Sequence, residues 1–290
     1  MARPDFDLQS HSVHSDGALS AAEVVARAAG AGVRLLSLTD HDTVDGVSEA
    51  LETGREAGIR VVRGVEITAV RGPDLDLHML GYELDHRDAG LASFLAGGRA
   101  DRELRMERMA DRLEELGLRF DRSVIAARRA AGQPIGRPHL AGAVLAEESN
   151  LERLRAEEAD TLDGFFTAYL VSGARAWVPR TQPSVSDAIA AIHAAGGVAV
   201  WAHPWFDVAS AAELEAEVDA FRAAGLDGVE CFYVEHTREQ TELLCDVCEA
   251  RGLLRTGSAD FHGPEHPRYS RFRAFDLYGR EPNLGPIGGG

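Results

Sequence analysis

The sequence of 290 residues contains no lysine, because all 30 of its basic residues are arginine. Without an ε-amino group there is no Schiff-base enzyme, no pyridoxal phosphate enzyme and no phosphate-binding loop that depends on its lysine. Acidic residues number 47, so the formal net charge is −17. A chain this acidic is not expected to present a broad basic face to duplex DNA, and a local phosphate site needs metal ions or a few arginines to reverse the sign.

Cysteine is scarce, and long apolar runs are missing. Of the three cysteines, Cys245 and Cys248 form a C-x-x-C spacing in a stretch that is typical of a helix. No second pair completes a structural zinc site, so we expect these residues and Cys231 to be buried core residues. No segment approaches the roughly 20 apolar residues of a membrane span, and MARPDFDLQS lacks the pattern of a signal peptide. We therefore expect a cytoplasmic protein with no membrane partner.

One structural unit recurs along the chain. A helix ends in small residues and glycine, a short apolar strand follows, and the strand ends at an acid or a histidine. The copies are RAAGAGVRLLSLTDHD, GREAGIRVVRGVEIT, HAAGGVAVWAHP, RAAGLDGVECFYVEH and EARGLLRTGSADFHG. Continuously apolar strands are typical of a parallel sheet buried on both faces. With the strands before His11 and around His78, the sequence predicts about seven strands in an α/β barrel whose chemistry lies at the C-terminal rim.

The repeating pattern breaks between residues 89 and 176, where the sequence predicts helices and no strands. The first of these helices carries four apolar residues on one face: Met106, Met109, Leu113 and Leu116. We predict two domains, a discontinuous barrel of residues 1–88 and 177–290 and a helical insert of residues 89–176 that stands over the rim. The glycine-rich end, GPIGGG, is expected to be disordered.

Histidines and carboxylates gather at or just beyond the predicted strands. The eight positions are His11, Asp16, His41, Glu66, His78, His203, Asp260 and His262. A single histidine at a strand end is usually a hydrogen-bonded structural residue, but eight such positions around one rim are hard to explain by packing. Buried together without a cation, the acids would repel one another and require protons. Divalent metals remove this repulsion, and mixed imidazole and carboxylate ligands suit Zn, Mn or Fe.

Six segments that carry these residues resemble, in order, the motifs of the polymerase and histidinol phosphatase (PHP) family of metal-dependent phosphoesterases. The segments are DLQSHSVHSDG, SLTDHDT, GVEIT, HMLGY, WAHPW and TGSADFHG. The resemblance covers nearly the whole chain and implies a distorted seven-stranded (β/α)7 barrel with two or three divalent metal ions. A hydroxide shared by such metals is a strong nucleophile near neutral pH. Glu66, Asp260 and His203 would then form the catalytic centre.

The resemblance also assigns metal ligands by position. The first metal would take His11, Glu66 and Asp260; the second would share Glu66 and take His78 and His203; the third would take Asp16, His41 and His262. The chain departs from the family at Gln9, which stands where the first histidine of an H-x-H motif is usual. Glutamine offers a neutral oxygen or no ligand, so we expect the first metal to be held more weakly while its other three ligands suffice. Asp40 and Asp42 flank His41 and are expected to orient it.

Substrate contacts are expected from the insert. GRPHLAG matches, at Gly136, Arg137 and His139, a G-R-x-H segment with which a subgroup of the family contacts substrate phosphate. Arginine is the best side chain for bidentate phosphate binding. His236 ends a predicted strand and is a further candidate for substrate binding. The subgroup resembled acts on nucleoside 3′,5′-bisphosphates and related nucleotides, some members trimming short RNA from the 5′ end, so we predict hydrolysis of a phosphate monoester on a small nucleotide.

Three alternatives stay open. The first is hydrolysis of histidinol phosphate or of a small cyclic phosphodiester, with histidinol phosphate disfavoured by the match to the insert. The second is a proofreading or regulatory module of a polymerase, disfavoured because the chain ends soon after the last motif with no polymerase attached. The third is a non-catalytic metal-binding or ligand-sensing module, which the glutamine at position 9 keeps open. The sequence leaves the substrate base, the metal and the oligomeric state undetermined.

Overall fold

The computed structural model describes residues 4–72, 75–130, 135–179 and 183–289. The chain divides into two compact units. The barrel unit contains residues 1–69, 77–96 and 183–290, and the helical unit contains residues 70–76 and 97–182. Helix α3 (Ala89–Glu115) contributes its first residues to the barrel unit and the rest to the helical unit.

Seven strands of the described chain form one sheet, in the order in which they occur in the sequence. They are β1 (Phe6–Asp7), β2 (Leu35–Leu38), β3 (Arg60–Arg71), β4 (Leu75–Tyr82), β5 (Val198–Trp201), β6 (Gly228–Tyr233) and β7 (Leu254–Ser258). The amide of Leu8, just after β1, donates to the carbonyl of Gly257 in β7 at 3.2 Å. The two outer strands therefore meet, and the sheet nearly closes. The predicted distorted barrel of seven strands is confirmed.

Strand β4 departs from the parallel arrangement that the apolar strands predicted. It pairs antiparallel with β5, with Met79 opposite Trp201. Arg71 ends β3 and Leu75 begins β4, so only three residues separate the two strands, too few for a parallel crossover. Because β4 runs backwards, its first half lies level with the C-terminal ends of its neighbours. The amide of Ala202 donates to the carbonyl of His78 at 3.1 Å, which brings His78 to the rim.

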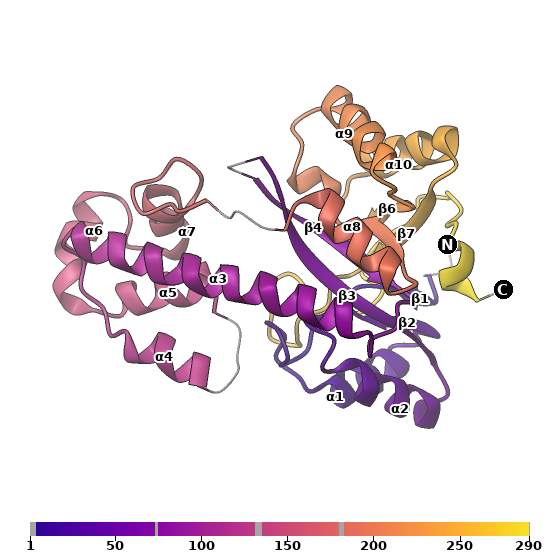
Figure 1. The fold of residues 1–290 in the computed structure, drawn as a ribbon, viewed down its shortest axis with the longest axis horizontal. Coiled ribbons are helices and arrows are strands. Elements are labelled where there is room, and N and C mark those ends of the chain that lie inside the picture. Colours follow the sequence, from indigo (N-terminus) through magenta and orange to yellow (C-terminus); the bar gives the residue numbers. More distant parts are fainter. Residues whose placement is uncertain (1–3, 73–74, 131–134, 180–182, 290) are drawn as a thin grey trace. The chain divides into compact units, whose positions relative to one another are not determined.

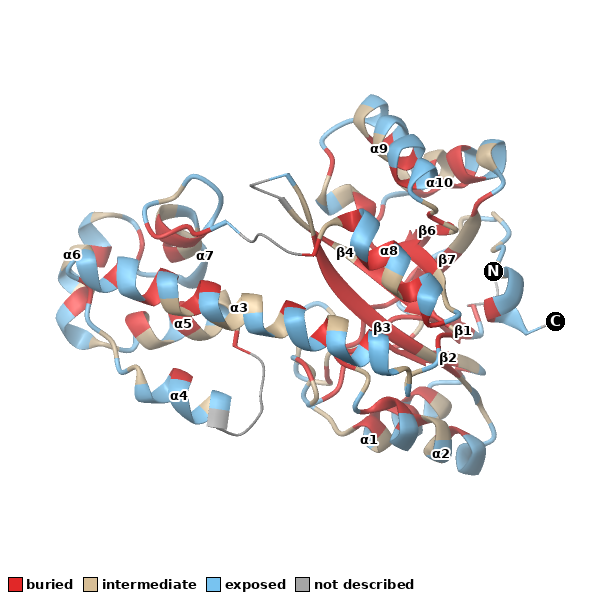
Figure 2. Ribbon diagram, viewed as in Figure 1, coloured by how far each residue is buried: buried red, intermediate tan, exposed pale blue. Residues whose placement is uncertain are grey.

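The barrel unit places its helices around the outside of the sheet (Figure 1). They are α1 (Ala21–Gly30), α2 (Val47–Ala57), α8 (Val185–Ala194), α9 (Ala211–Ala223) and α10 (Arg238–Arg251). Helices α1 and α10 begin at capping boxes, in which the hydroxyls of Ser20 and Thr237 accept the amide three residues on. Most of the sheet is buried (Figure 2), and Tyr82, Trp201 and Phe232 are among its largest buried side chains.

The structure also tests the predictions for the three cysteines and for the glycine-rich C-terminal end. The three cysteines are free and buried, one in β6 and two in α10, as predicted. The expected disorder of the glycine-rich end is wrong for residues 285–289, because residues 285–288 form a 3₁₀ helix and the fully buried Ile287 joins the barrel core. Burial of this apolar side chain stabilises the segment.

The helical unit has a separate apolar core. Its elements after α3 are α4 (Ser123–Ala130), α5 (Arg137–Leu145), the 3₁₀ turn η1 (Glu148–Asn150), α6 (Leu151–Ala156), α7 (Leu162–Phe165) and the π-helical turn η2 (Phe166–Leu170). Met106, Met109 and Leu113 of α3 are buried in this core, as their spacing predicted, and Leu116 is partly buried against it. Among the described helices, none is long and apolar enough to cross a membrane.

Candidate metal centre

The predicted ligands converge in the barrel unit. Three overlapping groups of side chains could each hold a metal ion. Within each group, every residue offers one ligand atom, and these atoms all lie within 4.8 Å of one another. The groups are His11–Glu66–Asp260, His41–Glu66–His78 and His11–Asp16–His41–His262. The first group has the composition predicted for the first metal, and the third adds His11 to the predicted set. The second contains His41 where His203 was expected.

His203 nevertheless lies beside the second group. Its Nε2 atom is 3.4 Å from Glu66 Oε1 and 3.3 Å from His78 Nδ1. All eight positions from the sequence therefore meet at one place, although their assignment to individual metals stays a prediction.

Glu66 is the centre of this arrangement. It is fully buried within β3, and its two oxygens face different neighbours. Oε1 is 2.6 Å from His78 Nδ1 and 3.4 Å from His203 Nε2, whereas Oε2 is 3.1 Å from His11 Nε2 and 3.7 Å from His41 Nδ1. Burial raises the pKa of Glu66, but the surrounding imidazoles lower it well below its usual range. An ionised carboxylate that faces two sets of ligands suits a bridge between two cations.

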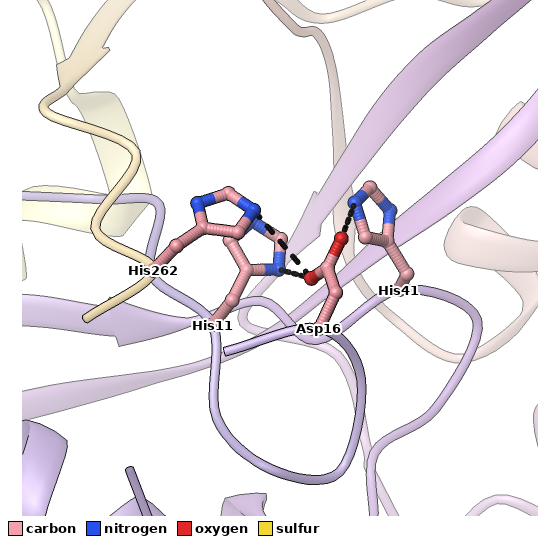
Figure 3. A group of neighbouring side chains, drawn as sticks. All are labelled: His11, Asp16, His41 and His262. Atoms are coloured by element: carbon pink, nitrogen blue, oxygen red, sulfur yellow. Dashed lines mark ion pairs between the residues drawn. The ribbon is translucent and has the colours of Figure 1, made fainter. Parts of the chain in front are cut away.

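Asp16, like Glu66, directs its two oxygens toward different histidines, and it lies at the more exposed end of the cluster (Figure 3). Its Oδ1 atom is 3.6 Å from His11 Nδ1 and 3.5 Å from His262 Nε2, and its Oδ2 atom is 3.6 Å from His41 Nε2. These separations are too long for good hydrogen bonds. They do suit ligands of one metal, because two atoms each about 2.1 Å from a tetrahedral ion lie about 3.4 Å apart.

Unsatisfied buried nitrogens also fit a metal. Among the described residues, His41 Nδ1 is buried and has no hydrogen-bond partner. Burial lowers the pKa of His41 to about 4, so the ring is neutral at pH 7 and retains a lone pair. Neutral imidazoles and ionised carboxylates are the donors that Zn, Mn and Fe bind. His41 and Glu66 therefore fit divalent metal ions in these protonation states. Burial lowers the pKa of His203, but its contact with Glu66 raises it overall to about 9, so this ring would release a proton on binding a metal.

Two predicted ligands stand on strained backbone that buried side chains support. His203 has φ 28° and Asp260 has φ 53°, both in the left-handed region, which is costly for residues other than glycine. Glu230 Oε2 accepts the amide of His203 at 2.9 Å, and the Tyr233 hydroxyl donates to Asp260 Oδ2 at 2.9 Å. Sequence reasoning did not assign Glu230 and Tyr233 a role. The available signal was their place in β6, a strand that is otherwise apolar.

Asp40 holds the loop that carries two of the ligands. Its carboxylate accepts the amide and hydroxyl of Ser12, each at 2.7 Å, and the hydroxyl of Ser15 at 2.6 Å. Asp42 accepts the amide of Thr68 at 2.9 Å. Asp40 was expected to orient His41. Its contacts show that it holds the segment from His11 to Asp16, because it binds Ser12 and Ser15 of that segment at the same time.

Gln9 is held by hydrogen bonds at both ends of its amide. Its Nε2 atom donates to Glu66 Oε2 at 2.9 Å, and its Oε1 atom accepts the hydroxyl of Ser258 at 3.3 Å. The amide oxygen is the atom able to bind a metal, and here it faces Ser258. Gln9 therefore supports Glu66 in this arrangement, and its part as a ligand stays a prediction.

A glutamine at this position is expected to leave the first metal the most weakly held. In a titration that follows bound metal and turnover together, the wild type should lose this ion first on dilution. Gln9→His should hold it, because imidazole is a much better donor than an amide oxygen. Gln9→Asn, the matched amide control, should resemble the wild type or bind metal more weakly. Equal retention by the wild type and Gln9→His would show that the weak-site hypothesis is wrong.

The candidate phosphate ligands of the insert lie in the helical unit. Arg137 begins α5, and its Nη1 atom donates to the carbonyl of Leu170 at 3.4 Å. Its guanidinium carbon is 5.4 Å from the centre of the Trp177 ring. His139 Nδ1 accepts the amide of Gly136 at 3.1 Å. His139 is thus held by the first turn of α5, and Arg137 by Leu170 and Trp177. Their contact with substrate stays a prediction.

His236 lies in the barrel unit behind Tyr233. Its Nδ1 atom is 3.1 Å from the carbonyl of Cys231, and its ring centre is 5.2 Å from that of Tyr233. Burial lowers the pKa of His236 to about 4, so the ring is neutral. Its predicted contact with substrate is not shown by these neighbours.

Comparison with known proteins agrees with this geometry. Residues 7–161 match the PHP domain. A 5′-3′ exoribonuclease from Haemophilus influenzae is 32% identical over 262 residues, which cover 89% of this chain and 90% of that protein. A 3′,5′-nucleoside bisphosphate phosphatase from Chromobacterium violaceum is 32% identical over 264 residues, covering 90% of this chain and 88% of that protein.

A solved structure also resembles the whole chain. It is an amidohydrolase from Chromobacterium violaceum with bound sulfate and no metal, and it matches with a TM-score of 0.77 and 28% identity over 98% of this chain and 93% of that one. The domain match, the two relatives and this structure lead to one conclusion: the chain belongs to the PHP domain family.

Proposed function

We propose that the protein hydrolyses a phosphate monoester of a small nucleotide, a nucleoside 3′,5′-bisphosphate or nucleoside monophosphate, with divalent metal ions as cofactors. The observation that carries the proposal is the buried Glu66 carboxylate, whose oxygens face two sets of imidazoles. The prediction that the protein is an enzyme, a phosphoric ester hydrolase, is confirmed by its relatives. The nucleotide substrate is supported by similarity to the exoribonuclease and the bisphosphate phosphatase.

The residues that would hold the metals are those of the three groups, with Glu66 shared between two of them. Divalent metals, when bound there, would lower the pKa of water and neutralise phosphate oxygens. The protein's own charge of −17 repels a phosphate ester, so local positive charge is needed for binding as well as for chemistry. Glu230 and Tyr233 act through other residues, because they hold the backbone of His203 and the carboxylate of Asp260.

Arg137 and His139 are proposed to contact the substrate phosphate. The support is the resemblance of GRPHLAG to the segment with that role in the family, together with the position of both residues in the first turn of α5. A guanidinium offers a planar fork of donors that matches two phosphate oxygens.

The proposed function is tested by measuring phosphate release from a panel of substrates in the presence of manganese. The panel contains nucleoside 3′,5′-bisphosphates, nucleoside monophosphates, short 5′-phosphorylated RNA, histidinol phosphate and a small cyclic phosphodiester. We expect the nucleotides to have the highest kcat/KM. A higher kcat/KM for histidinol phosphate or the cyclic ester would contradict the proposal, and no turnover of any substrate by metal-loaded protein would favour the non-catalytic alternative.

One variant in the same panel addresses the insert. Arg137→Ala should keep its bound metal and lower kcat/KM for nucleotides by about 10²-fold, if the lost charge-assisted bond is worth roughly 3 kcal/mol. Arg137→Lys should recover part of the loss, since lysine lacks the planar fork. Normal turnover by Arg137→Ala would show that Arg137 of the insert does not bind the substrate phosphate.

A further inference from the structure

An exposed aromatic ring stands beside the candidate metal centre. Phe206 ends the short 3₁₀ helix η3 (Pro204–Phe206) that follows His203, and 53% of its surface is exposed. It is the one aromatic residue among the exposed large apolar side chains of the described chain. Single exposed apolar side chains are ordinary on protein surfaces, so exposure alone does not indicate a binding site. The position of Phe206 beside the predicted ligands does.

The ring of Phe206 contacts two side chains of the centre. His203 is itself a predicted metal ligand, and Tyr233 contacts another. Its centre is 5.2 Å from that of the His203 imidazole and 5.6 Å, edge to face, from that of the Tyr233 ring. His203 in turn lies 3.4 Å from Glu66, and the Tyr233 hydroxyl donates to Asp260. The covered part of Phe206 thus includes its contacts with His203 and Tyr233, and the remainder faces solvent.

The chain holds this ring in place. Pro204 fixes the backbone at the start of the turn, and the amide of Phe206 donates to the carbonyl of His203 at 3.1 Å. Trp205, between them, is partly buried and packs against the barrel core. An aromatic side chain positioned in this way loses little conformational entropy when a flat ligand stacks on it.

We propose that Phe206 is the platform on which the base of a nucleotide substrate stacks, and that the site thereby selects phosphate esters that carry a base. This inference rests on the proposed function and names the group that the site recognises. In a nucleotide only the sugar separates phosphate from base, so with a phosphate at the centre the base would be within reach of a ring that touches His203 and Tyr233. Stacking needs no positive charge, which suits a chain with a net charge of −17, and every base offers a π-face for it.

The test compares the base-dependent and base-independent parts of turnover in the full-length, manganese-loaded protein. The substrates are adenosine 5′-monophosphate and ribose 5-phosphate. They share the sugar and the phosphate, but only the first carries a base. Phe206→Ala should lower kcat/KM for the nucleotide by about 10- to 100-fold, the range expected from loss of one stacked base. It should leave kcat/KM for ribose 5-phosphate and the bound metal unchanged.

Two further variants complete the design. Phe206→Trp keeps an aromatic face and should retain the preference for the nucleotide. Val124→Ala removes exposed apolar surface in the helical unit, where Val124 is 46% exposed, and should alter neither substrate. Calorimetric binding of adenosine, which has no phosphate, gives a readout independent of turnover and should weaken only in Phe206→Ala.

Failure of the inference is distinguishable from failure of the proposed function. Equal losses on both substrates in Phe206→Ala would show that Phe206 only supports His203, and an unchanged preference would show that the base binds elsewhere. Either result overturns the inference while nucleotide turnover by the wild type stands. If the wild type hydrolyses no nucleotide, the proposed function fails, and the inference fails with it.

Discussion

Removal of divalent metal is expected to abolish turnover, and addition of Mn or Zn to the metal-free protein is expected to restore it. Glu66, Asp260 and Asp16 lie in one cluster of the barrel unit, and the other members of its three ligand groups are histidines. A phosphate ester would meet this cluster as a further anion, so neither binding nor attack is favourable without cations.

The measurement combines phosphate release with metal content. Protein treated with chelator and then dialysed should contain no metal and release no phosphate, and turnover should return as the sites fill. Metal that binds only the folded state also stabilises it, by about 2.7 kcal/mol at a free concentration 100 times Kd. The Tm should therefore rise in the same titration. Full activity in protein shown to be metal-free would refute the prediction.

Glu66→Ala is expected to lose bound metal and to reduce turnover by orders of magnitude while the barrel still folds. Glu66 belongs to two of the three ligand groups, so one substitution removes a ligand from two metals. It also removes the partner of His78 Nδ1, at 2.6 Å, and of His11 Nε2, at 3.1 Å. Some loss of stability is expected as well, because His78 Nδ1 then loses this carboxylate, whereas His11 Nε2 keeps Asp260 Oδ1 at 3.1 Å.

Two control variants are needed. One tests whether the charge of Glu66 matters apart from its side-chain volume, and the other tests whether loss of a carboxylate away from the cluster has any effect. Glu66→Gln keeps the side-chain volume but removes the negative charge, and it should also lose metal. Glu83→Gln alters a carboxylate whose partners are Arg60 and Arg63, away from the cluster, and should keep both metal and turnover. Metal content and circular dichroism are measured for each variant. A folded Glu66→Ala protein with the metal content and turnover of the wild type would rule out the bridging role.

Much of the barrel could be predicted because strand formation and burial depend on local patterns. Apolar runs bounded by glycine predicted the strands, and the 3.6-residue period predicted α3 with Met106 and Met109 inside. The direction of β4 was missed because an apolar strand has the same pattern in either orientation. In this case the short connection from Arg71 to Leu75 was a sequence signal that decides against a parallel crossover.

By itself, then, the sequence determined which side chains could meet a metal, because a polar residue at the end of a buried strand is restricted to the rim. Only the tertiary structure decided how those residues combine. His11 and Asp260 are 249 positions apart yet lie at 3.1 Å, and Gln9 reaches Glu66 across 57 positions. Such pairs depend on the closure of the sheet and on side-chain rotamers, and neither leaves a local pattern in the sequence. For the same reason the support of His203 by Glu230 and the place of Phe206 beside it became visible only in the folded chain.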